Sequence, residues 1–84
     1  MNYSKMQSGL ETLARFVSSV IILEGMTIIP SIEELSDSLT IAGEELGIDM
    51  KKKYRDTAIP HIISYLKAHG LKVEEENEVK SNNN

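Results

Sequence analysis

Residues 31–48, SIEELSDSLTIAGEELGI, contain the signals for the start, the buried face and the end of one helix. Ser31 and Glu34 have the spacing of a capping box, in which each side chain accepts a hydrogen bond from the other residue's backbone amide. Gly47 followed by Ile48 is typical of a helix that ends on a left-handed glycine and an apolar contact. Between them, apolar residues recur at spacings of three and four: Ile32, Leu35, Leu39, Ala42 and Leu46. Gly43 inside this helix costs roughly 1 kcal/mol relative to alanine, so we expect a close contact there.

The chain before this segment predicts a longer first helix over residues 3–24. Its apolar stripe also recurs at spacings of three and four, through Met6, Leu10, Leu13, Val17 and Val20. The second half of the helix is apolar around most of its circumference, which is more than a three-helix domain can bury. We therefore expect a homodimer whose interface is formed by Phe16, Val17, Val20, Ile21 and Leu23. Alternatively, Met26, Ile28, Ile29 and the C-terminal extended residues cover that face within one chain.

Residues 49–56, DMKKKYRD, predict a short helical turn capped by Asp49. The last long helix is then expected to start at Asp56 or Thr57, because Pro60 is tolerated in a first turn but disrupts a helix interior. Its predicted inner face consists of Ile59, Ile62, Ile63 and Leu66. Gly70 and Leu71 repeat the glycine ending of the preceding helix.

The predicted fold class is all-α, a small bundle of three long helices plus a short helical turn. Residues 71–73 form a brief extended C-terminal segment, and residues 1–73 make up a single helical domain. Residues 74–84, EEENEVKSNNN, are acidic and rich in asparagine, and they predict a disordered tail.

The composition argues against an enzyme. There is no cysteine among the 84 residues, which excludes disulfides and thiolate chemistry. His61 and His69 are too far apart to act as a metal-binding pair on one helical turn, and Glu44 and Glu45 point to different sides of a helix. We therefore expect no catalytic residues, no metal and no cofactor.

The longest apolar stretch, FVSSVIIL at residues 16–23, is much shorter than the roughly 20 residues that a membrane span needs. No basic segment precedes it in the way that a signal peptide requires. We therefore expect no membrane association and a cytoplasmic location.

Positive charge is concentrated in residues 51–55, the one part of the sequence that suggests a phosphate-binding site. The net charge of −4 disfavours nucleic acid as a partner, but Lys51, Lys52, Lys53, Tyr54 and Arg55 form a local basic run. Such a run either forms a solvated corner or contacts phosphates, with Tyr54 as a flat anchor among the cations.

Two family resemblances bear on this choice. Residues 42–49, AGEELGID, resemble the first helix and turn of a helix-turn-helix, and residues 65–73, YLKAHGLKV, resemble the end of a winged-helix recognition helix. Over residues 42–73, this resemblance to winged helix-turn-helix DNA-binding regulators implies that Lys51, Lys52, Lys53 and Arg55 begin the DNA-facing helix.

The second resemblance, over residues 31–69, is to acyl carrier proteins, which share the order of a helix ending EELGID, an irregular turn and a helix ending YLKAH. It implies a phosphopantetheine-bearing serine in an Asp-Ser-Leu motif. Asp37-Ser38-Leu39 lies in the middle of its predicted helix, and Ser31 follows proline rather than aspartate, so we expect no modification at either serine.

The sequence therefore favours a small regulatory DNA-binding protein of the winged-helix type. The alternative is a helical module that occludes or regulates a protein partner, and the third hypothesis is a degenerate acyl-carrier-like protein.

Overall fold

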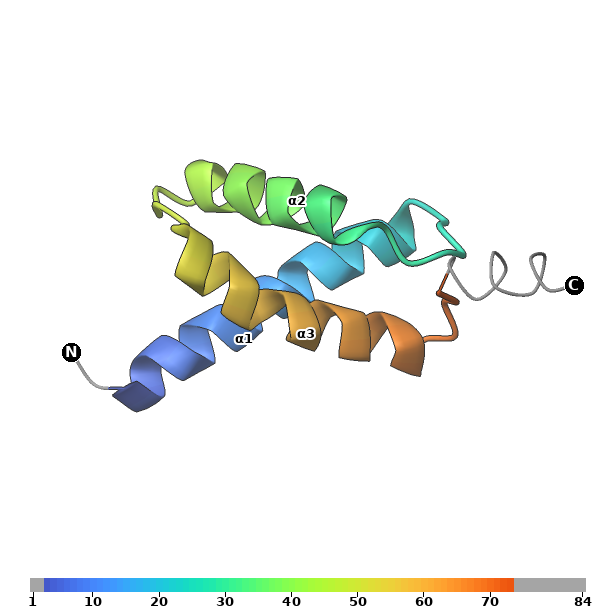
Figure 1. Cartoon of the computed structure of the whole chain (residues 1–84), viewed down its shortest axis with the longest axis horizontal. Coiled ribbons are helices and arrows are strands. Elements are labelled where there is room, and N and C mark those ends of the chain that lie inside the picture. Colours follow the sequence, from blue (N-terminus) through green and yellow to red (C-terminus); the bar gives the residue numbers. More distant parts are fainter. Residues whose placement is uncertain (1–2, 74–84) are drawn as a thin grey trace, which may run out of the picture.

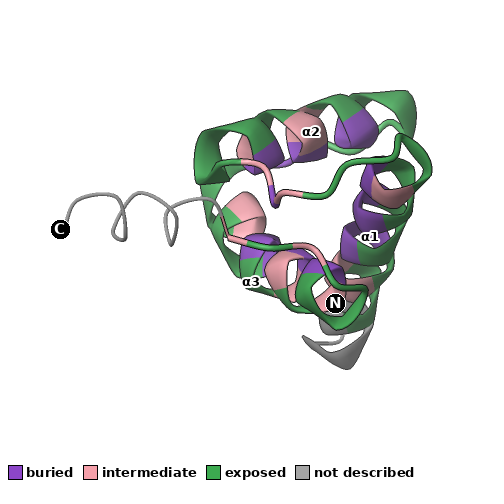
Figure 2. Ribbon diagram, turned by 90° about the vertical axis from the view of Figure 1, so that its right-hand side faces the viewer, coloured by how far each residue is buried: buried purple, intermediate pink, exposed green. Residues whose placement is uncertain are grey.

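The chain folds into three helices around one aliphatic core (Figure 1). The structure is a computed structural model that describes the backbone of residues 3–73 and the side chains of residues 8–73. The helices are α1 (Tyr3–Leu23), α2 (Ile32–Glu45) and α3 (Lys52–Ala68). Seen end-on, they form the three sides of a triangle whose buried residues face inward (Figure 2). The all-α prediction is confirmed, and residues 3–73 contain no β-strand.

The helix boundaries around α2 follow from the predicted signals. Ser31 Oγ accepts from the Glu34 amide at 3.1 Å, and the Glu34 carboxylate accepts from the Ser31 amide at 3.1 Å. Gly47 has a φ of 75°, and the Ile48 amide donates to the Gly43 carbonyl at 2.7 Å. This pair of features closes the helix as a Schellman ending.

The core is built mainly from aliphatic side chains of all three helices. Four of them are completely buried: Leu35, Leu39, Ile62 and Leu66. The predicted stripe of α2 is only partly correct, because Ile32 and Leu46 at its two ends are exposed. Met6 of the predicted α1 stripe lies outside the described side chains.

The five residues predicted to form a dimer interface separate into two groups. Val17 and Ile21 are buried in the core of a single chain, whereas Phe16, Val20 and Leu23 remain exposed. The excess apolar surface of α1 is therefore smaller than the sequence pattern indicates.

Helix α3 differs more from the sequence prediction than the other two helices do. It runs without interruption from Lys52 to Ala68, so the separate turn over residues 49–56 and a new start at Asp56 or Thr57 are wrong. Lys51, not Asp49, occupies the N-cap position, and Pro60 lies in the helix interior. Pro60 and Asp56, whose carbonyl loses its usual donor, are both exposed, so water can reach the interrupted hydrogen bond. Burial of the stripe that includes Ile59 and Ile62 then favours one continuous helix.

The segment after α3 returns to the connection between α1 and α2. Lys72 forms an isolated parallel bridge with Ile28, and its amide donates to the Thr27 carbonyl at 3.0 Å. The Ile29 amide donates to the Lys72 carbonyl at 2.8 Å. The extended segment expected at residues 71–73 thus contains a single bridge residue. The tail expected at residues 74–84 lies outside the described residues.

Candidate protein-binding groove and basic corner

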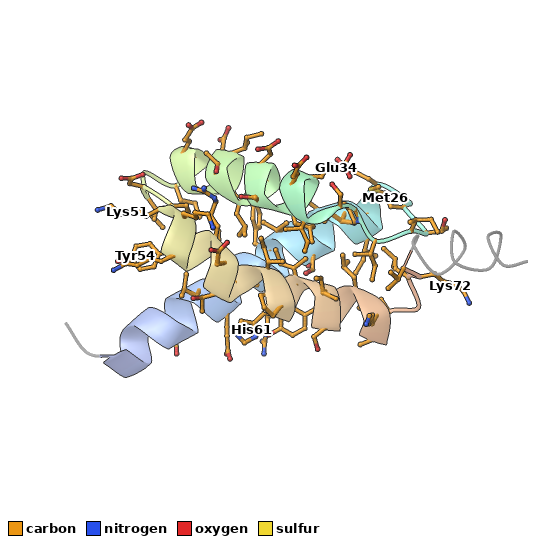
Figure 3. All side chains as sticks on the ribbon, viewed as in Figure 1. Met26, Glu34, Lys51, Tyr54, His61 and Lys72 are labelled. Atoms are coloured by element: carbon orange, nitrogen blue, oxygen red, sulfur yellow. The ribbon has the colours of Figure 1, made fainter. Side chains whose placement is uncertain are left out.

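The predicted basic run, Lys51–Arg55, lies at the corner where the chain leaves α2 and enters α3; Lys51 and Tyr54 mark it in Figure 3. Lys51, Lys52 and Lys53 are exposed. Lys52 Nζ lies 2.8 Å from a carboxylate oxygen of Asp56, a solvent-exposed pair of the kind that contributes little to stability. The corner therefore presents three lysines to solvent, one of them already paired.

The other two residues of the run have structural contacts. Arg55 is half-buried, and its Nε donates to Ser36 Oγ at 2.7 Å while its Nη1 donates to the Met50 carbonyl at 2.6 Å. These bonds join α2 to the start of α3. Tyr54 packs against the core, and Lys53 Nζ lies 5.5 Å from the centre of its ring. Both residues are among the predicted phosphate contacts, and in the structure they have these intramolecular contacts.

A groove between α1 and α2 is one of the largely apolar concave surfaces among the described residues. Its lining comes from the second half of α1 and the residue that follows it, Phe16, Val17, Val20, Ile21 and Glu24, and from α2, Ser38, Ile41, Ala42 and Glu45. The hollow has a volume of about 210 Å³. An apolar cavity of roughly 150 Å³ binds benzene, so the groove has room for a leucine or phenylalanine side chain.

The apolar walls of the groove are open to solvent. Phe16 is 52% exposed, Ile41 is 58% exposed and Val20 is 39% exposed. Leu23, although 85% exposed, does not line the groove. Four of the five predicted interface residues thus lie beside Ile41 of α2, a residue that the sequence pattern does not single out: Phe16, Val17, Val20 and Ile21.

Ile41 was missed because it lies beside the buried stripe of α2 and not on it. The signal that could have identified it is an isoleucine flanked by acidic residues at i−4, i+3 and i+4, which are Asp37, Glu44 and Glu45. An apolar side chain at the centre of an otherwise acidic helix face has no packing partner within its own helix.

The only charged side chains that line the groove are acidic. α1 and α2 run in roughly opposite directions (Figure 1), so Glu24, just after α1, and Glu45, the last residue of α2, lie toward opposite ends of the groove. Helix α2 contains five acidic residues and no basic residue.

The two serines considered for carrier chemistry lie in different surroundings. Ser38 is half-buried in the groove wall, and the Ser31 hydroxyl caps α2. Within residues 3–73 no cluster of histidine, aspartate or glutamate could hold a metal ion, and none of the helices has the length and apolarity needed to cross a bilayer.

No protein-family model, no curated protein and no solved structure matches this chain.

Proposed function

We propose that the chain is a helical protein-binding module whose α1–α2 groove receives an apolar segment of a protein partner. The observation that carries the proposal is the exposure of Phe16, Val20 and Ile41 around a single hollow. Contiguous apolar surface rimmed by polar residues is typical of interaction sites on small soluble domains. Single exposed apolar residues elsewhere, such as Leu23, do not by themselves indicate binding.

The proposal is tested by comparing two isoleucines of α2. Ile41→Ser removes an apolar wall of the α1–α2 groove. Ile32→Ser removes a side chain of similar exposure, 62% against 58%, from a separate hollow between α2 and α3, so the pair also tests which hollow binds. If a partner buries the exposed part of Ile41, the substitution costs about 0.9–1.7 kcal/mol of binding free energy, which is 58% of the usual 1.5–3 kcal/mol.

The binding probe is a synthetic amphipathic peptide with leucines along one face, titrated into the full chain by fluorescence anisotropy. We expect Ile41→Ser to weaken binding roughly 5- to 20-fold and Ile32→Ser to leave it unchanged. Equal affinities of the two variants would refute the groove as the binding site.

DNA binding through Lys51, Lys52 and Lys53 is the second candidate function. It is supported by the exposure of these lysines at the N-terminal end of α3, where backbone amides and the helix dipole also favour phosphate. The engagement of Arg55 with Ser36 and the net charge of −4 count against it. If the corner binds duplex DNA, replacing the three lysines with glutamate flattens the dependence of affinity on salt by roughly one unit of slope per lost contact. An unchanged slope excludes this function.

A further inference from the structure

The groove has the length of a short helical contact. Glu24, just after α1, follows Phe16 by eight positions, and a rise of about 1.5 Å per residue makes this roughly 12 Å. Ser38 to Glu45 covers a similar length on α2. A partner helix therefore contacts the groove over about two turns, with apolar anchors at i and i+3 or i+4.

The carboxylates at the two ends of the groove determine which charge on a partner helix is favourable there. Glu24 and Glu45 are both exposed, and among residues 8–73 neither takes part in a salt bridge. A partner that covers the apolar walls brings its own flanking residues next to these carboxylates and partly removes water from them. Losing that water is unfavourable for a carboxylate unless a cation or a hydrogen-bond donor replaces it.

A second copy of this chain does not meet that requirement. A twofold contact through the groove places the Glu24 and Glu45 carboxylates of both copies near one another, because each copy contributes the same surface. The groove lining contains no lysine or arginine to offset them. The basic corner of a second copy offers cations beside the exposed Leu46 and Ile48. A contact between this corner and the groove is heterologous, however, and joins chains head to tail into a ring or a filament rather than a twofold dimer.

We propose that the α1–α2 groove binds a cationic amphipathic helix, with an apolar side chain in the hollow and lysine or arginine facing Glu24 and Glu45. This inference rests on the protein-binding function proposed above and adds the charge of the partner to it.

The test uses two synthetic helices of about 18 residues, roughly five turns, that share the same leucine face. One carries lysines at both ends of that face and the other carries glutamates at the same positions. Each is titrated into the full chain at about 20 mM and at about 0.5 M NaCl, because salt screens exposed charge pairs. The same titrations use the double variant Glu24→Gln/Glu45→Gln and a control, Glu11→Gln/Glu33→Gln, which removes two charges outside the groove.

At low salt we expect the lysine helix to bind roughly tenfold more tightly than the glutamate helix. This preference should shrink at high salt and in the groove variant but persist in the control. If both helices bind equally, or if the control loses the preference as completely as the groove variant, the inference about charge is wrong and the protein-binding groove stands.

If neither helix binds, sedimentation equilibrium separates the two remaining outcomes. A mass of twice 9.4 kDa that falls to the monomer value in Ile41→Asp overturns the cationic partner in favour of a second copy. A monomer that binds neither helix overturns the protein-binding function as well.

Discussion

Gly43 offers the sharpest test of the packing described above, through the substitution Gly43→Ala. A Cβ atom at this position would lie 2.6 Å from Met50 Cγ and 2.8 Å from the Ile48 carbonyl oxygen. Met50 is buried, and Ile48 is fixed by the hydrogen bond from its amide to the Gly43 carbonyl. Neither atom can therefore move without disturbing the core or the end of α2.

The expected magnitude is the difference between two opposing effects. Alanine gains roughly 1 kcal/mol over glycine in a helix interior, whereas overpacking of this kind costs typically 1–3 kcal/mol. The net expectation is a loss of about 1 kcal/mol in the free energy of unfolding. Gly9→Ala is the matched control, because Gly9 lies in α1 and no described atom would lie within 4 Å of its added Cβ. That variant should gain stability.

Helix propensity cancels when the two variants are compared, so their difference measures the steric cost alone. Urea and thermal unfolding followed by circular dichroism should show Gly43→Ala less stable than Gly9→Ala by about 1–3 kcal/mol. For a domain of this size, each kcal/mol shifts Tm by roughly 4–8 °C. If Gly43→Ala is as stable as Gly9→Ala, the close approach of α2 to the segment around Met50 is refuted.

Three further substitutions test the helix ends and the corner by the same unfolding assays. Ser31→Ala removes the capping hydroxyl and should cost about 1 kcal/mol; no loss would show that the capping box is not formed. Pro60→Ala restores a backbone donor inside α3 and should stabilise the chain by about 1–3 kcal/mol, whereas destabilisation would indicate a helix that really begins near Asp56. Arg55→Lys cannot keep both of its hydrogen bonds and should cost about 1–2 kcal/mol, and a neutral result would leave the arginine free for phosphate.

The parts of the fold that depend on local backbone chemistry could be predicted from the sequence. Ser31 with Glu34 and Gly47 with Ile48 satisfy hydrogen bonds within a few residues, so their spacing is enough to locate the ends of α2. The continuity of α3 could not be predicted in this way. Pro60 is locally unfavourable, and the burial of Ile59 and Ile62 against other helices outweighs it.

The candidate site likewise has one part that could be predicted from the sequence and one part that could not. The apolar excess at Phe16 and Val20 was visible in the sequence, because too many directions around α1 are apolar. That Ile41 lies beside them depends on how α1 and α2 pack, which no local pattern contains. The contacts of Tyr54 and Arg55 could not be predicted for the same reason, since in the sequence an arginine that donates to Ser36 on another helix cannot be told from one without such a bond.

The bridge between Lys72 and Ile28 couples the local unfolding of two segments that lie far apart in the sequence. They are the segment after α3 and the connection between α1 and α2. The Ile29 amide can exchange with solvent only when its bond to the Lys72 carbonyl breaks, and the Lys72 amide only when its bond to the Thr27 carbonyl breaks. Because the two bonds share one residue, detachment of the segment after α3 should release both amides together, as one unit of local unfolding. Hydrogen exchange followed by NMR would then report nearly equal protection for Ile29 and Lys72, although they are 43 positions apart in the sequence (72 minus 29).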